Sequence, residues 1–319
     1  LVRSMNLVSV RLLLFETGIG NAVRHIAKFG FGDAALPRNG SLALGGGAAS
    51  PLDMAQGFAV FANGGHAIKP HVIDSIFGPD GENLYRADPP VVCEACEADP
   101  DTIVALDDEG NPMVAFPLEQ MADVVDEYRP DASTAPELFA DVNAAPRVIS
   151  AQNAFLIQDM MRDVIRRGTG RRAMVLGRRD LSGKTGTSND QRDAWFGGFN
   201  GDIASVVWVG YDDDLPLGPG EEGSRTALPI WIEFMRIALR GAPENQMPIP
   251  DGIVSRRIDR ATGCPARAGQ LNSTFEYFRE GNVPECDDVE DLPDIFNDAS
   301  GIDPVEEPPT EEEEEEPLF

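Results

Sequence analysis

Lysine and histidine are the scarcest functional residues in this chain. Lysine occurs only as Lys28, Lys69 and Lys184 among 319 residues, and the 3 histidines stand far apart. Scattered histidines exclude a histidine-based metal site, so we expect neither a metal nor a cofactor. Apolar runs long enough to span a bilayer are also missing, and we find no signal peptide.

Lysine and arginine together are outnumbered by aspartate and glutamate. The chain holds 26 Lys and Arg against 54 Asp and Glu, which gives a net charge of −28. Binding to nucleic acid is excluded on this ground, because phosphate contacts require a basic face. Residues 287–319 hold 15 of the acidic side chains and no Lys or Arg, so this Pro- and Glu-rich stretch predicts a disordered, solubilising tail.

The four cysteines form two candidate pairs. Cys93 and Cys96 lie close together in a polar stretch, and Cys264 and Cys286 lie further along the chain. An even number of cysteines favours disulfides in an oxidising compartment. Zinc is the rival interpretation, although the second pair lacks the close spacing of a zinc knuckle, and free thiols stay open as a third.

Apolar periodicity predicts alternating helical and extended regions. The sequence Ser50-Pro51-Leu52-Asp53 has the form of a capping box, and Ser150 is a suitable cap for a helix that ends at Gly168. A last helix should open at Pro229, with Ile230, Phe234 and Ile237 on one face. The other expected helices are 7–16 and 22–29, and the expected strands are 72–77, 181–187, 194–199, 204–211 and 253–258. Strands followed by a terminal helix predict an α+β fold, an antiparallel sheet backed by helices.

Composition divides the chain into five segments. We expect a helical part, an irregular insertion or surface excursion, a part with the sheet and its helices, a C-terminal extension, and the acidic tail. In the same order, these segments are 1–78, 79–147, 148–245, 246–286 and 287–319.

The stretch Ser182-Gly183-Lys184-Thr185-Gly186-Thr187 carries the clearest chemistry. On an edge strand it would offer an anionic ligand a cation, two hydroxyls and an open backbone. A phosphate loop is excluded, because Arg178 stands where that motif needs glycine and strands follow where it needs a helix. The glycines of 168–173 follow a helix, not a strand, so they predict a helix-terminating loop and no dinucleotide site.

Lys-Thr-Gly is also one part of a three-part signature of serine acyl-transfer enzymes. A second part, Ser-x-Asn, occurs as Ser4-Met5-Asn6. The remaining part, Ser-x-x-Lys, is absent, because the residues three places before the lysines are His25, His66 and Leu181. We therefore expect that the nucleophile lies upstream of Leu1.

Several further stretches resemble the transpeptidase domain of class A penicillin-binding proteins, and within them the penicillin-binding protein 1A group. The stretches are 3–9, 42–45, 51–55, 61–65, 166–173, 180–190 and 193–196. The resemblance covers 1–78 and 147–279. It implies the penicillin-binding and β-lactamase-like transpeptidase fold, truncated at its N-terminus.

The resemblance implies serine acyl transfer. In this family a serine attacks the D-Ala-D-Ala end of a peptidoglycan stem peptide, and a neighbouring amine or water takes the acyl group; β-lactams acylate the same serine. By resemblance, Ser4 relays a proton to the leaving amine and Asn6 holds the donor amide. Lys184 supplies positive potential, and the hydroxyls of Thr185 and Thr187 bind the terminal carboxylate.

The same resemblance assigns two backbone roles in the strand. Gly186 lets an extended peptide lie against the strand, and the N–H of Thr187 is one of two oxyanion donors. Asp193 and Trp195 are expected to support the structure.

The resemblance also implies a longer parent protein on the periplasmic face of the bacterial inner membrane. It would have an N-terminal membrane anchor and a glycosyltransferase domain. Its partners would be peptidoglycan stem peptides, β-lactams, and outer-membrane lipoproteins or the complexes of cell division and elongation. We expect the present chain alone to be inactive. Two alternatives stay open: a catalytically dead module that binds peptidoglycan peptides, and a serine β-lactamase or DD-carboxypeptidase.

Overall fold

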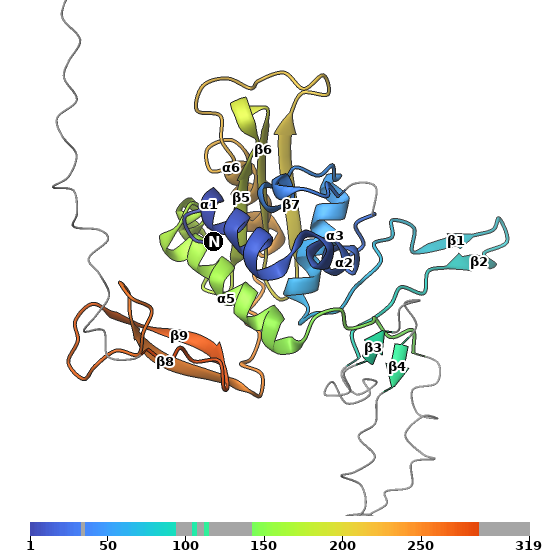
Figure 1. Cartoon of the computed structure of the whole chain (residues 1–319). Coiled ribbons are helices and arrows are strands. Elements are labelled where there is room, and N and C mark those ends of the chain that lie inside the picture. The colour runs from blue at the N-terminus through green and yellow to red at the C-terminus, as the bar shows by residue number, and fades with distance from the viewer. Residues whose placement is uncertain (33–35, 94–103, 107–111, 115–141, 287–319) are drawn as a thin grey trace, which may run out of the picture. The chain divides into compact units, whose positions relative to one another are not determined.

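A computed structural model describes residues 1–32, 36–93, 104–106, 112–114 and 142–286. It divides into two compact units, Leu1–Ile253 and Val254–Phe319 (Figure 1). The five-part division and the acidic tail at 287–319 stay predictions, since the tail lies outside the described residues.

A three-stranded antiparallel sheet forms the centre of the first unit. Its strands are β5 (Ser182–Thr187), β6 (Asp193–Phe199) and β7 (Ala204–Gly210), in that order across the sheet. The register pairs Lys184 with Gly197 and Gly186 with Trp195. The three strands expected from the sequence are thus confirmed within one residue at each end. Among the described residues β5 has a neighbour on one side only, which leaves its outer edge open.

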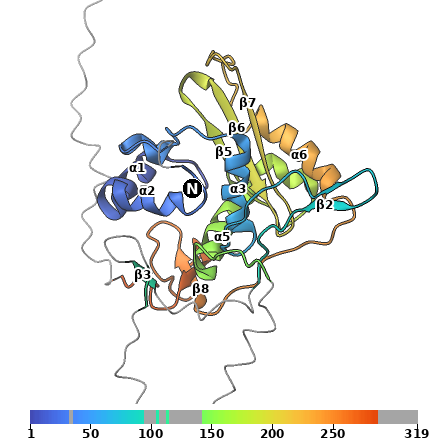
Figure 2. The ribbon, with the colours of Figure 1, turned by 90° about the vertical axis from the view of Figure 1, so that its right-hand side faces the viewer.

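Helices cover both faces of this sheet. They are α3 (Pro51–Ala62), α5 (Ala151–Arg167) and α6 (Ala227–Ala238). Phe58 of α3 lies over Gly197, whereas Trp231 of α6 lies over the next residue, Gly198. Because successive residues of a strand face opposite sides, α3 and α6 cover opposite faces, as the side view in Figure 2 shows. This arrangement confirms the predicted α+β layers.

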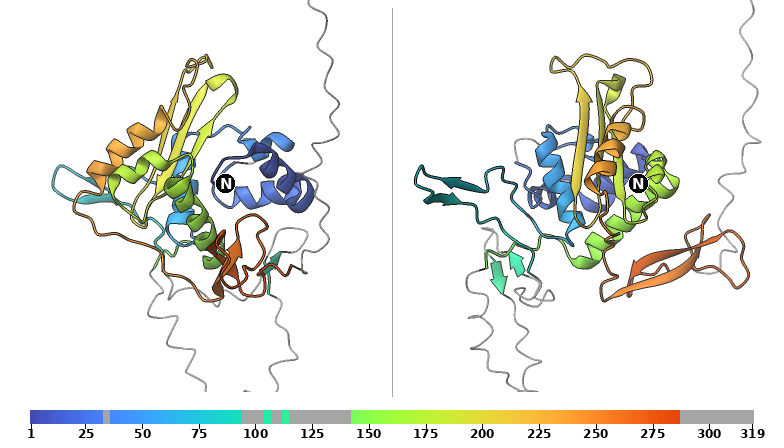
Figure 3. Two further views of the ribbon diagram at one scale, coloured as in Figure 1. Left: turned by 90° about the vertical axis from the view of Figure 1, so that its left-hand side faces the viewer. Right: turned by 180° about the vertical axis from the view of Figure 1, so that it is seen from behind.

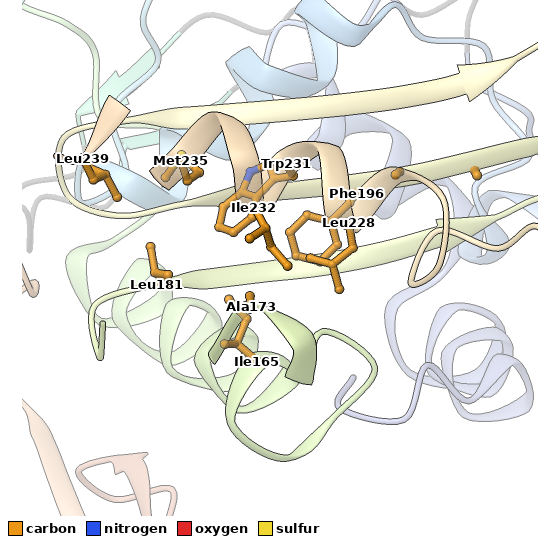
Figure 4. Close-up of a cluster of buried hydrophobic side chains, with 11 residues drawn as sticks. Ile165, Ala173, Leu181, Phe196, Leu228, Trp231, Ile232, Met235 and Leu239 are labelled. Carbon is orange, nitrogen blue, oxygen red and sulfur yellow. The ribbon is translucent and has the colours of Figure 1, made fainter. Parts of the chain in front are cut away.

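The main core lies between α5, the sheet and α6 (Figure 4). Phe196 meets Trp231 edge to face, with ring centroids 4.9 Å apart, and both side chains are fully buried. Trp231 also donates its indole N–H to the carbonyl of Ser205 at 3.2 Å, so its polar atom is satisfied. Leu181, just before β5, is 1% exposed in the same cluster. The core therefore fixes the strand that carries Lys184.

Local sequence signals place two of these helices correctly. The side chain of Ser50 accepts from the N–H of Asp53, and the Asp53 carboxylate accepts from the N–H of Ser50, so the capping box is confirmed. The side chain of Ser150 caps α5, which ends at Gly168 as expected.

The start of the last helix was predicted two residues too late, since α6 begins at Ala227 and not at Pro229. Ile230, Phe234 and Ile237 do share a face, but that face is exposed. The opposite face packs, with Trp231 and Met235 fully buried. Both faces of α6 are apolar, so periodicity alone could not predict which face is buried. The face with Trp231 is buried because its indole fits over Gly198 and Phe196.

Short helices precede the sheet in the chain or join its first two strands. They are α1 (Asn6–Arg11), a π-helical segment η1 (Leu12–Thr17), α2 (Ile19–Ala27), and the 3-10 segments η3 (Gly40–Leu44), η5 (Arg171–Leu176) and η6 (Asn189–Gln191). The helix expected over 7–16 is confirmed, although its second half is wound as a π-helix. Within the described part of the chain, no helix has the length and apolar character needed to cross a bilayer.

Two-stranded pairs complete the described structure. The first unit has β1 (Ser75–Phe77) with β2 (Asn83–Arg86), and β3 (Val104–Leu106) with β4 (Pro112–Val114). Region 79–147, expected to be irregular, therefore contains short strands. The other pair is β8 (Ile253–Asp259) with β9 (Ser273–Arg279), drawn as a ribbon in Figure 3. The sequence indicated β8 but gave no expectation for β9.

Candidate functional site

Lys184 is the centre of the candidate site. Its Nζ donates to the Ser4 hydroxyl at 2.7 Å and to the carbonyl oxygen of Thr185 at 2.8 Å. Burial lowers the pKa of the Lys184 ammonium, because desolvation disfavours its charged form. The structure thus brings together two residues that lie 180 positions apart and that the sequence placed in one site.

Ser4 is presented by a tight turn before α1. Its N–H donates to the carbonyl of Leu1 at 3.1 Å, and its φ of 53° is left-handed. Few residues other than glycine adopt this conformation without strain. Asn6 is the first residue of α1 and is exposed, so the second polar residue of the motif also stands at the surface.

Thr185 is held by a residue that the sequence did not single out. Its hydroxyl lies 2.7 Å from the hydroxyl of Thr169, in the loop that ends α5. Thr185 is only 9% exposed. The bond therefore satisfies a mostly buried hydroxyl that was expected to bind a carboxylate.

Thr187 is held from the other direction. Its hydroxyl accepts from the N–H of Gly223 at 3.1 Å, in the loop before α6, and its own hydrogen stays available for donation. A Cβ at Gly223 would lie 2.2 Å from the carbonyl oxygen of Trp195 and 2.4 Å from that of Gly186. Only glycine fits so close to two backbones. Gly223 was not expected as part of the site.

Asp193 and Trp195 lie next to the site, where the sequence assigned them a supporting role. The carboxylate of Asp193 accepts the indole N–H of Trp208 at 2.8 Å. The rings of Trp195 and Trp208 are 6.0 Å apart across β6 and β7. Trp195 also pairs with Gly186 across the two strands. A Cβ at Gly186 would lie only 3.0 Å from the Cβ of Trp195, which is closer than most Cβ contacts in proteins.

A buried ionic network anchors the entry to β5. Asp180 is 2% exposed and accepts from the guanidinium of Arg178, from the side chain of Asn200 and from the N–H of Asn245. Burial alone would raise the pKa of Asp180, but these hydrogen bonds outweigh it and lower the pKa. The carboxylate therefore stays charged and ties three loops to the start of the strand.

The remaining predicted residues include the cysteines. Cys264 and Cys286 form a disulfide, with their Cα atoms 5.7 Å apart. The pairing of Cys93 with Cys96 stays a prediction, because Cys96 lies outside the described residues. No group of three or more His, Cys, Asp or Glu that could hold a metal occurs in the part of the chain that the structure describes.

The site therefore has a cation of weakened basicity, a serine hydroxyl bound to it, and two threonine hydroxyls along an open strand edge. Such a set can move a proton between Ser4 and a reacting group and can bind a carboxylate. Sequence motifs indicated Ser4, Lys184, Thr185 and Thr187. Thr169 lies in the stretch 166–173 that carries the resemblance but was assigned no role, and Gly223 gave no signal, because each makes its contact with a distant segment.

Known proteins resemble the chain over most of its length. Penicillin-binding protein 1A of Pseudomonas aeruginosa is 42% identical over 295 residues, which is 92% of this chain and 35% of the relative. Penicillin-binding protein 1A of Vibrio cholerae is 35% identical over 309 residues, covering 89% of this chain and 34% of the relative. The crystal structure of penicillin-binding protein 1A from Haemophilus influenzae matches with a TM-score of 0.72 and 32% identity, over 90% of this chain and 40% of that one.

These matches cover only part of each relative. The chain spans about a third of the length of the curated relatives it matches. No protein-family model matches it. At 32% identity and a TM-score of 0.72, the shared architecture is the transpeptidase fold that the sequence predicted.

Proposed function

From the homology of the chain to penicillin-binding protein 1A over most of its length, we propose that it is part of a peptidoglycan DD-transpeptidase and penicillin target. The observation that carries the proposal is the hydrogen bond from Lys184, on the Lys-Thr-Gly-Thr strand, to the hydroxyl of Ser4. In this reading the nucleophilic serine and its lysine lie in residues outside these 319. The chain alone therefore lacks the group that is acylated.

The residues that the sequence motifs indicated have roles in this chemistry. As the nucleophile attacks the penultimate D-Ala carbonyl, it gives its proton to its own lysine. Ser4 then receives that proton while it passes its own proton to the departing D-Ala amine. Lys184 favours this relay because its ammonium donates to the Ser4 oxygen, which makes the Ser4 hydroxyl proton easier to give up. A hydroxyl relay of this kind is a form of general acid–base catalysis.

Substrate binding follows from the open edge of β5. The terminal carboxylate of the stem peptide accepts from the hydroxyls of Thr185 and Thr187, and the peptide lies along the strand beside Gly186. The N–H of Thr187 and that of the nucleophile stabilise the oxyanion, and each such donor is worth roughly 3 kcal/mol. Asn6 holds the donor amide. A second peptide's amine then takes the acyl group, and water in its place gives carboxypeptidase activity.

The proposal extends to the parent protein. It would carry a membrane anchor and a glycosyltransferase domain and act on the periplasmic face of the inner membrane. Lipoproteins of the outer membrane and the division and elongation complexes are its proposed partners.

Labelling with a fluorescent penicillin tests the function. We expect the parent protein to be labelled, and we expect the isolated 319-residue chain not to be. Lys184→Met should lower the labelling rate by at least tenfold, whereas Lys69→Met, a lysine without a place in the site, should leave it unchanged. An intact folded parent that takes no label contradicts the transpeptidase and favours a module that only binds stem peptides.

A further inference from the structure

Thr169 links two parts of the site and has no role in the function proposed above. It follows Gly168, the residue that ends α5. From this loop it contacts strand β5 through its side chain and the segment before Ser4 through its backbone. Each contact bears on a different part of the acyl-transfer chemistry.

The side-chain contact controls where a proton points. The hydroxyls of Thr169 and Thr185 are 2.7 Å apart, so one of them donates to the other. If Thr169 donates, the hydrogen of Thr185 is free for a ligand. A bound carboxylate favours this direction, because the chain from Thr169 through Thr185 to an anion strengthens both hydrogen bonds.

The backbone contact joins the loop to the segment before Ser4. The N–H of Thr169 donates to the carbonyl of Val2 at 3.4 Å, two residues before Ser4. A Cβ at Gly168 would stand 2.4 Å from the same oxygen, so the close approach requires glycine there. The loop therefore packs directly against the turn that presents the Ser4 hydroxyl to Lys184.

We propose that Thr169 is a positioning residue whose hydroxyl orients that of Thr185 toward the terminal carboxylate of the donor peptide or of a β-lactam. This inference rests on the proposed transpeptidase function. It adds a residue that does not touch the substrate and yet sets the preference for a free carboxylate. Without the hydrogen bond from Thr169, the buried Thr185 hydroxyl could adopt several orientations.

Two variants of the parent protein separate orientation from structure. Thr169→Val keeps the shape of the side chain and removes its hydroxyl, whereas Thr169→Ser keeps the hydroxyl. The rate constant of acylation is measured with a penicillin that has its free carboxylate and with the methyl ester of the same penicillin. Thermal unfolding of each variant reports on folding.

We expect Thr169→Val to slow acylation by the free acid about fivefold to tenfold, the value of one hydrogen bond, and to leave the ester rate unchanged. Thr169→Ser should stay within about twofold of the unmodified protein for both compounds. In a Thr185→Val background, Thr169→Val should have no further effect on the acid, because the two residues act as one unit.

Three results would overturn the inference. Equal slowing of acid and ester by Thr169→Val indicates a purely structural role. An unchanged acid rate shows that the hydroxyl does not matter. Failure of the unmodified parent to react with either penicillin removes the proposed function itself, and the inference with it.

Discussion

The central sheet and the β8–β9 hairpin have the same antiparallel pairing but are stabilised by different means. The sheet rests on a core in which Phe196 and Trp231 are fully buried. The described part of the hairpin contributes no residue to the buried hydrophobic set, and its Phe275 is 70% exposed. It has instead the disulfide between Cys264 and Cys286. Strand pairing alone does not make a rigid platform, and the strand that carries Lys184 lies in the region with the core.

The sheet should be broken most severely by Trp231→Ala. Removing a fully buried indole that packs on Phe196 leaves a cavity, and we expect the free energy of unfolding of the first unit to fall by about 3–5 kcal/mol. Denaturant titration followed by circular dichroism measures this loss. Ile230→Ala, one position away and 51% exposed, is the matched control and should change it by less than about 0.5 kcal/mol. Similar losses in both variants would show that α6 does not pack through Trp231.

The hairpin should respond to its disulfide instead. Replacing Cys264 and Cys286 by serine opens a link between residues 22 positions apart, and we expect its local stability to fall by about 3 kcal/mol. Amide hydrogen exchange over β8 and β9 should speed up, while exchange over β5–β7 stays the same. Unchanged exchange in the hairpin would mean that its strands are held by other contacts.

A smaller effect, on the sheet alone, should come from acid. The pKa of Asp180 is lower in the folded than in the unfolded protein, so the unfolded state binds this proton first as the pH falls. Its stabilising effect is complete above the unfolded carboxyl pKa of about 4 and is lost as the pH drops through the lower folded value. We expect a loss on the order of 1 kcal/mol, measured by urea titration between about pH 5 and pH 2.

Asp180→Asn is the control for the acid experiment, because it removes the carboxylate that is expected to titrate. Asp180→Asn should be less stable at neutral pH, because Arg178 then lacks its charged partner, and its remaining stability should depend less on pH. The same acid dependence in both proteins would assign the effect to other carboxylates.

Local chemistry made much of the fold predictable. The alternating run of 204–211 and the capping box at Ser50 depend on residues close in sequence, and both are found where they were expected. The exposed face of α6 was not predictable, because both of its faces are apolar and only the fit of Trp231 against the sheet distinguishes them. β9 was missed because its charged and aromatic residues do not alternate clearly.

The candidate site divides in the same way. Ser4 and Lys184 were indicated by motifs that a known chemistry requires, and the structure places them within hydrogen-bonding distance. The contacts of Thr169 and Gly223 join segments that fold together only when α5 and α6 pack on the sheet. Such contacts leave no local pattern, so the sequence could indicate the groups proposed to bind substrate but not the residues that contact them from distant segments.

The left-handed backbone of Ser4 shows how stability and function are opposed at one residue. Glycine would adopt a φ of 53° freely, whereas serine in this region costs roughly 1 kcal/mol. Glycine, however, has no oxygen to place beside Lys184. The turn is therefore less stable with serine than with glycine, but only serine provides the hydroxyl. A search for stabilising substitutions at this position would select glycine, which removes the proposed relay.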